Sequence, residues 1–135
     1  MMSERGQDVE GAWRRRAVSL EARHLLAGRR EHRACALVPL FGLLGLDALP
    51  GVKLYGPPPG QPRTPTVAFT LEGRPARDVS AHLSDRHGVF LSHGHFYAAN
   101  ITEDLGVEGL VRAGCACYTT SEEIDRLVQG VSELV

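Results

Sequence analysis

The clearest pattern of apolar and polar positions lies at residues 66–71. Valine, phenylalanine and leucine alternate there with threonine and alanine, which is the two-residue period of a strand with one buried face. Residues 52–55 predict a shorter strand before it. The chain between the two is rich in glycine and proline at 56–62, which indicates a stiff, extended loop.

A leucine- and alanine-rich stretch from Val18 to Ala48 predicts a helix. Pro39 should kink or break this helix, because proline lacks the amide hydrogen and clashes with the preceding turn. The Leu-Pro-Gly sequence at 49–51 marks its end.

Residues 75–87 predict a second helix. Pro75 suits the first helical position, and Val79, His82 and Leu83 recur on one face. Gly88 then favours the left-handed conformation that commonly ends a helix.

A last helix is expected after Thr120, where Thr-Ser-Glu-Glu supplies an N-cap and early negative charge. Its apolar residues have helical spacing and should face a core: Ile124, Leu127, Val128, Val131 and Leu134.

The remaining segments predict a short buried strand at 89–91, a polar loop at 92–95, a short helix at 96–105 and a strand at 110–118. Strands and helices therefore mix with short connections. This order predicts an α+β fold, with a small, mostly antiparallel sheet and helices packed on it.

The composition fits one domain of 135 residues. The 15 basic and 16 acidic residues nearly balance, so no global charge favours nucleic acid or a membrane. Eight of the arginines lie in residues 1–33, which indicates a solvated helix face or, alternatively, a nucleic-acid-binding arm. We expect residues 1–30 to form a basic, partly helical or disordered segment, and residues 31–135 to form the domain.

The cysteines Cys35, Cys115 and Cys117 are odd in number. The N-terminal sequence is polar and has no apolar signal region, so we expect a cytoplasmic protein with free thiols. Cys115 and Cys117 alternate on an expected strand, which would point both side chains to one face. Buried, unreactive thiols are the preferred interpretation, since a metal pair would need two more ligands.

Two polar features between residues 93 and 112 have more than one possible function. His93 and His95 could be surface or hydrogen-bonded histidines, could share a metal, or could face a ligand. Arg112 lies in an apolar strand, where it needs either a structural ion pair with Asp or Glu or a carboxylate ligand that its planar fork can bind.

The motifs of two common enzyme classes are missing from the sequence. It contains no G-x-S-x-G nucleophile elbow and no G-x-x-x-x-G-K phosphate-binding loop. Neither Ser-His-Asp hydrolysis nor this type of nucleotide binding is therefore expected.

Several segments resemble known sequence in order and spacing. These are LPGVKLYG at 49–56, RTPTVAF at 63–69, GVFL at 88–91 with GHFYA at 94–98, VRAG at 111–114, and YTTSEEIDRL at 118–127. Together they resemble the C-terminal small domain of class V aminotransferases, in the cysteine desulfurase-like branch. The resemblance covers about residues 48–135.

The resemblance implies a pyridoxal phosphate-dependent enzyme that acts on an amino acid by desulfuration, lysis or transamination. By position, Arg112 matches the arginine that binds the substrate α-carboxylate, and His95 lies in the loop at 92–97 that lines the site. In this family the large domain supplies the lysine that binds the cofactor.

The sequence departs from the family pattern at two positions. In the stretch Gly94-His95-Phe96-Tyr97 an aromatic residue stands where the desulfurases have their persulfide-forming cysteine, and the single lysine, Lys53, lies where the family has surface residues. We therefore expect the chain to hold no cofactor covalently and to be inactive alone. It would work with a large-domain partner or as a homodimer. The alternative is a non-enzymatic interaction module, or a truncated fragment that docks on a large domain.

Overall fold

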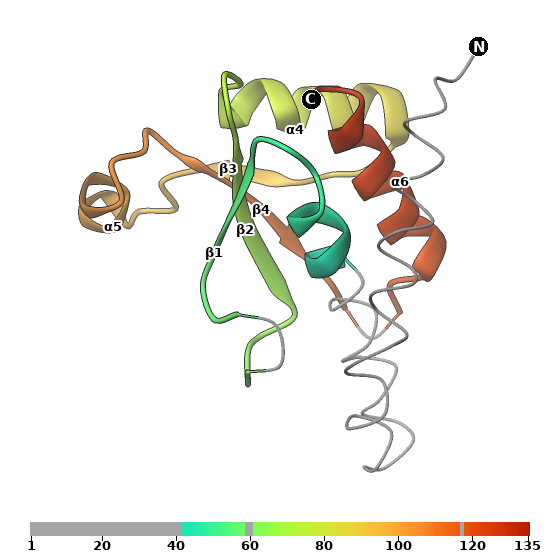
Figure 1. Ribbon diagram of the computed structural model, residues 1–135, viewed down its shortest axis with the longest axis horizontal. Coiled ribbons are helices and arrows are strands. Elements are labelled where there is room, and N and C mark those ends of the chain that lie inside the picture. The colour runs from blue at the N-terminus through green and yellow to red at the C-terminus, as the bar shows by residue number, and fades with distance from the viewer. Residues whose placement is uncertain (1–41, 59–60, 117) are drawn as a thin grey trace.

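Four antiparallel strands form one sheet in the computed structural model, which describes residues 42–58, 61–116 and 118–135 (Figure 1). The strands are β1 (Val52–Tyr55), β2 (Thr66–Leu71), β3 (Ser92–Gly94) and β4 (Leu110–Gly114). Their order in the sheet is β1-β2-β4-β3, so β2 and β4 are the central strands.

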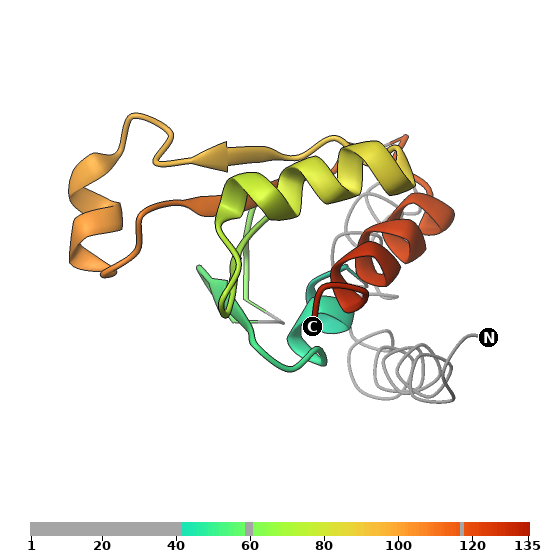
Figure 2. The ribbon, with the colours of Figure 1, turned by 90° about the horizontal axis from the view of Figure 1, so that it is seen from above.

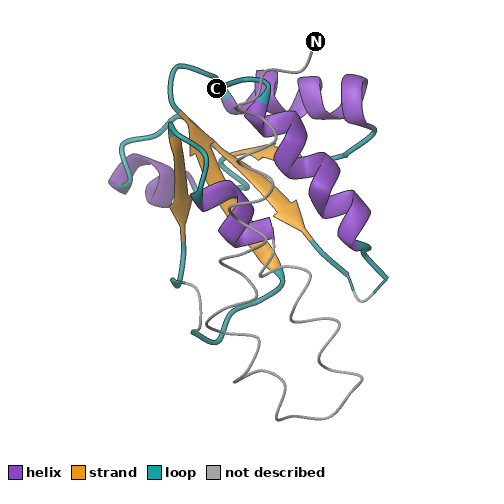
Figure 3. Ribbon diagram, turned by 45° about the vertical axis from the view of Figure 1, so that its right-hand side comes forward, coloured by secondary structure: helices purple, strands orange, loops and turns teal. Residues whose placement is uncertain are grey.

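The helices are α4 (Ala76–His87), α5 (Ala99–Asp104) and α6 (Ser121–Ser132), and residues 42–47 are also helical. The segment 42–47, α4 and α6 pack together beside the sheet, while α5 projects away from it at the far end of β3 and β4 (Figures 2 and 3). No helix in the described part of the chain is long and apolar enough to cross a lipid bilayer.

One face of the sheet forms the core. Val67, Phe69 and Leu71 of β2 are buried, and Val111 and Ala113 of β4 join them. The helices cover this face with buried leucine, isoleucine and valine side chains: Leu43, Leu46, Val79, Leu83, Ile124, Leu127, Val128 and Val131.

The pairing register of the strands determines which side chains lie on the face of the sheet away from the helices. Ala68 of β2 pairs with Arg112 of β4, which pairs in turn with Ser92 of β3. Because successive side chains of a strand point to opposite faces, these three lie in a row away from the helices. Lys53 and Tyr55 of β1 have the same parity, so the open face is polar and cationic.

The architecture predicted from the sequence is confirmed. The α+β class, the antiparallel sheet and the element order all agree with the structure. The strands at 52–55 and 66–71 have the predicted bounds. Gly88 ends α4 with a φ of 62°, and Thr120 caps α6 in a capping box with Glu123.

The predicted buried strand at 89–91 is wrong. The strand is Ser92–Gly94, in the segment expected to be a loop, and Phe90 is 85% exposed. Backbone groups before it bond to α4 instead of the sheet, since Val89 N–H donates to Leu83 O and Ser80 Oγ donates to Leu91 O at 2.7 Å.

Two further predicted boundaries are wrong. The short helix begins at Ala99 instead of Phe96, because Phe96 and Tyr97 have positive φ angles of 51° and 60°. The strand expected at 110–118 ends at Gly114, so Cys115 lies beyond it.

Several expectations fall outside the described residues. These concern the segment 1–30, the helix before residue 42 with its break at Pro39, and the thiols of Cys35 and Cys117.

Candidate functional site

Arg112 lies near the middle of the open face of the sheet. It occupies the third position of β4, between two residues that are buried beneath the helices, so its side chain points away from the core. The side chain is exposed, and the desolvation cost that an arginine in an apolar strand would suggest does not arise.

Two side chains hold the guanidinium of Arg112. Its Nε donates to Ser92 Oγ at 3.3 Å, and Ser92 Oγ donates to the backbone oxygen of Arg112 at 3.3 Å. On its flat side, the Cζ atom lies 4.2 Å from the ring centroid of Phe96, a cation–π contact. These contacts restrict the plane and direction of the fork.

The loop after β3 brings Phe96 to this position. Phe96 and its neighbour Tyr97 both adopt left-handed backbone conformations. Such conformations cost about 1–3 kcal/mol each in residues other than glycine, and they cluster at functional sites. Within the loop, the Tyr97 N–H donates to Nδ1 of His95 at 3.1 Å, and the two rings meet edge to face.

The ion pair considered for Arg112 is not found among the described residues. The ion pairs there join histidines to Glu133, and the Nη groups of Arg112 have no hydrogen-bond acceptor in this part of the chain. The sequence left a carboxylate ligand as the other alternative, and two parallel N–H donors match the two oxygens of a carboxylate.

The two candidate histidines of this region differ in placement. His95 is exposed and follows β3 in the same loop as Phe96, where its hydrogen-bond partner is Tyr97 and not Arg112. His93 pairs with Val111 in the register, so it lies on the helix side of the sheet. Among the described residues, neither histidine belongs to a group of three or more side chains that could hold a metal ion.

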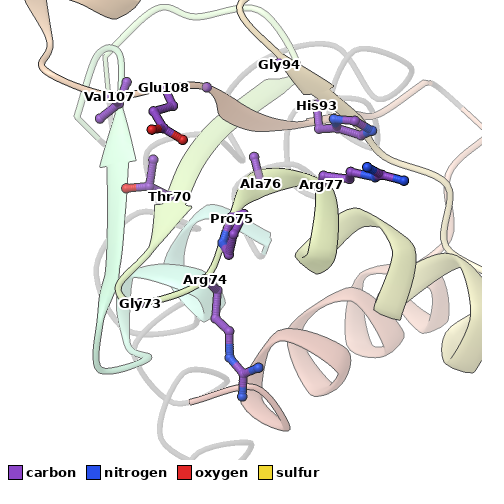
Figure 4. Close-up of a pocket in the computed structure, with 11 residues that line it drawn as sticks. Thr70, Gly73, Arg74, Pro75, Ala76, Arg77, His93, Gly94, Val107 and Glu108 are labelled. Carbon is purple, nitrogen blue, oxygen red and sulfur yellow. The ribbon is translucent and has the colours of Figure 1, made fainter.

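A pocket of about 520 Å³ lies beside the start of α4 (Figure 4). His93 and Arg77 lie side by side at one end of it, Thr70 and Glu108 at the other, while Arg74 points away. Arg112 does not line this pocket. The pocket and the arginine fork are thus separate features.

Lys53 does not fit the role of a cofactor-binding lysine. It is exposed on the outer strand β1, and its Nζ lies 5.2 Å from the ring centroid of Tyr55. A Schiff base with a cofactor needs a lysine amine enclosed in the site. Lys53 lies instead on an exposed edge strand of the sheet.

Cys115 is a half-buried free thiol just after β4. Burial, and secondarily the charge of Glu123, raises the pKa of Cys115, which disfavours the nucleophilic thiolate. This agrees with the expected unreactive thiol, although Cys115 lies outside the strand that was to hold it.

The resemblance placed Phe96 and Ser92 in the loop that lines the site, but sequence reasoning did not predict their direct contacts with Arg112. The sequence placed Phe96 in a helix and Ser92 in a loop, and their convergence on Arg112 depends on the pairing of β3 with β4. The available signal was the aromatic pair at 96–97 directly after the Gly-His sequence.

A family model described as "Aminotransferase class-V" matches residues 40–127. A cysteine desulfurase of Pectobacterium atrosepticum is 40% identical over 94 residues, and one of Escherichia coli O127:H6 is 37% identical over 94 residues. Each alignment covers 70% of this chain and 22% of the relative. The chain thus spans about a fifth of the length of the curated relatives it matches.

Solved structures share this fold. The cysteine desulfurase CsdA of Escherichia coli matches with a TM-score of 0.68 and 23% identity, over 82% of this chain and 27% of that one. The apo cysteine desulfurase of Thermococcus onnurineus NA1 matches with a TM-score of 0.62 and 31% identity, over 79% of this chain and 25% of that one.

Proposed function

The chain belongs to the class-V aminotransferase family, and we propose that it forms the C-terminal small domain of a cysteine desulfurase-like enzyme that acts on an amino acid in the cytoplasm. In this proposal Arg112 binds the α-carboxylate of the substrate, and His95 lies at the rim of the same site. The observation that carries it is the oriented guanidinium of Arg112, exposed on the open face of the sheet.

The surroundings of Arg112 suit this role. Ser92 uses the inner Nε, and Phe96 covers one flat side, so the two outer Nη groups remain for a ligand. A fork fixed before binding loses less conformational entropy when the carboxylate arrives. Because the site is exposed in this chain, we expect weak binding that strengthens when a second domain excludes water.

The family depends on pyridoxal phosphate, which stabilises the carbanion formed from the amino acid. The residues of this chain support a substrate-binding part and not the covalent attachment of that cofactor. We propose that another part of the same protein, or a separate large-domain chain, supplies the lysine. The 135-residue chain alone is then inactive.

The reaction class follows from the loop at 95–97. A persulfide mechanism needs a thiolate close to the substrate. Aromatic residues and no cysteine follow Gly94-His95 in this chain, and Cys115 is both half-buried and disfavoured as a thiolate. These observations favour lysis or transamination over sulfur transfer through a cysteine of this domain.

Titration of the ¹⁵N-labelled chain with L-cysteine, followed by NMR, tests the carboxylate site. The Nε–H signal of Arg112 and the amide signals of β4 should shift to saturation. Cysteamine, which lacks the carboxylate, should leave them unchanged. Arg112→Lys keeps the charge but loses the fork, so it should abolish the shift.

Arg126→Lys is the matched control for that experiment, because Arg126 is an exposed arginine on α6. It should bind as the unchanged chain does. Equal shifts with cysteamine, or unaltered binding in Arg112→Lys, would refute the carboxylate site. Absorbance of a lysine-bound cofactor together with turnover of an amino acid by this chain alone would refute the need for a large domain.

The exposed apolar side chains favour a second candidate, an interaction module. Phe90, Tyr97 and Tyr118 are 85%, 101% and 82% exposed, and Ile101 of α5 is 57% exposed. Exposed apolar side chains mark a docking surface where they form one contiguous patch. Size-exclusion chromatography with light scattering should show association if they dock a partner copy, and a clean monomer over a wide concentration range argues against it.

A further inference from the structure

Three metal-binding side chains meet between α4 and the end of α6. His82 and His87 lie on α4, and Glu133 directly follows α6. Nε2 of His87 lies 2.9 Å from Oε2 of Glu133, and Nε2 of His82 lies 3.2 Å from the same oxygen. The three possible ligand atoms all lie within 4.8 Å of one another.

The packing of α4 against α6 fixes the position of His87, which is the most buried of the three side chains. The His87 side chain is only 10% exposed and packs against α6 at Gly130. A Cβ atom at Gly130 would lie 2.8 Å from Cδ2 of His87, so only glycine leaves room for the ring. His82 and Glu133 are 22% and 42% exposed, which gives an ion a path from solvent.

The distances between the nitrogen and oxygen atoms of the cluster are close to those between the ligands of a zinc site, so only a small movement is needed to bind the ion. Zinc binds imidazole nitrogen and carboxylate oxygen at about 2.0–2.2 Å, which places neighbouring ligand atoms of a tetrahedral site about 3.3 Å apart. The two nitrogen–oxygen distances are already close to this value. A rotation of the exposed Glu133 side chain, with water as the fourth ligand, completes the geometry.

We propose that His82, His87 and Glu133 bind a divalent zinc-type ion that clamps α4 to α6. The cluster lies in the helix layer, on the opposite side of the sheet from Arg112. The clamp therefore does not depend on the proposed carboxylate site.

Calorimetric titration of the reduced 135-residue chain with zinc chloride at neutral pH tests the clamp. The chain should bind one zinc ion with high affinity, and zinc should raise its thermal unfolding midpoint. Glu133→Gln and His82→Gln change exposed or partly exposed groups, so they should fold normally. Each should weaken binding by at least about tenfold, the loss seen even for outer-shell partners of metal ligands.

His93→Gln is the matched control, because it removes an exposed histidine from β3 and should bind zinc normally. Cobalt(II) should give d–d bands of a nitrogen–oxygen site, without the charge-transfer band of thiolate ligands. Unchanged zinc affinity in both Glu133→Gln and His82→Gln would overturn the proposal. So would equal loss in His93→Gln, or a thiolate band.

Discussion

The contact between α4 and α6 at Gly130 leads to the sharpest stability prediction. Gly130 is buried near the C-terminal end of α6, and the side chains of Leu83 and His87 fill the space beside it. The substitution Gly130→Ala adds a single methyl group. An ideal Cβ there would overlap Cδ2 of Leu83 and lie 2.8 Å from Cδ2 of His87.

Two opposing effects set the size of the change. Alanine stabilises a helix interior by about 1 kcal/mol over glycine. Forcing a methyl group into a filled core costs about 1–3 kcal/mol. Leu83 is fully buried and the His87 ring is rigid, so neither can move aside easily. We expect Gly130→Ala to lower the free energy of unfolding by about 1–2 kcal/mol.

Gly42→Ala provides the matched control for this experiment. Gly42 is also helical, but its Cβ would meet Ile124 at 3.5 and 3.6 Å, which is ordinary van der Waals contact. The same chemical change should therefore stabilise the chain by up to about 1 kcal/mol. Urea unfolding followed by circular dichroism measures both variants against the unchanged chain.

Opposite signs for the two variants would support the close packing of the helices. If Gly130→Ala were as stabilising as Gly42→Ala, the helices would have room for a methyl group. The steric argument, and the fixed position of His87 that rests on it, would then be wrong.

Three smaller predictions concern single groups. Thr120→Ala removes the capping box with Glu123 and should cost about 1 kcal/mol in urea unfolding, while Thr120→Ser should restore most of it. The lowered pKa of Glu133, caused first by its hydrogen bond with His87, adds stability that is present above the usual pKa of 4.5 and is lost as the pH falls below it. Glu133→Gln should therefore flatten the acid side of the stability profile, and an unaltered profile would contradict this. The raised pKa of Cys115 should make its alkylation by iodoacetamide at neutral pH slower than that of a free cysteine, as peptide mass spectrometry can measure.

The sequence correctly predicted those strands and helix ends that depend on residues close together in the chain. The alternation at 66–71 gave the strand bounds because one face of β2 is buried and the other is not. Thr120 and Gly88 marked helix ends correctly, since caps depend on neighbouring backbone groups and on the freedom of glycine at positive φ.

The failure at 89–91 has a non-local cause. Val89, Phe90 and Leu91 are apolar and favour a strand by composition, but strand preference depends on the available partner. Here α4 takes the backbone groups of Val89 and Leu91, and β4 pairs with the polar residues that follow. The sequence could single out Arg112 as a polar residue within an apolar strand, whereas its contact with Phe96 depends on backbone conformations that no apolar pattern indicates.

The open face with Arg112 is a consequence of how the opposite face packs. Val111 and Ala113 are buried under the helices, and this alternation forces Arg112 outward between them. A slip of one residue in the β2–β4 register would bury the guanidinium and expose the two apolar side chains. Such a slip would lose the favourable burial of the two apolar side chains and would add the free-energy cost of removing a charge from water. The fork is therefore held in place by the core, and the loop with Phe96 only has to set its direction.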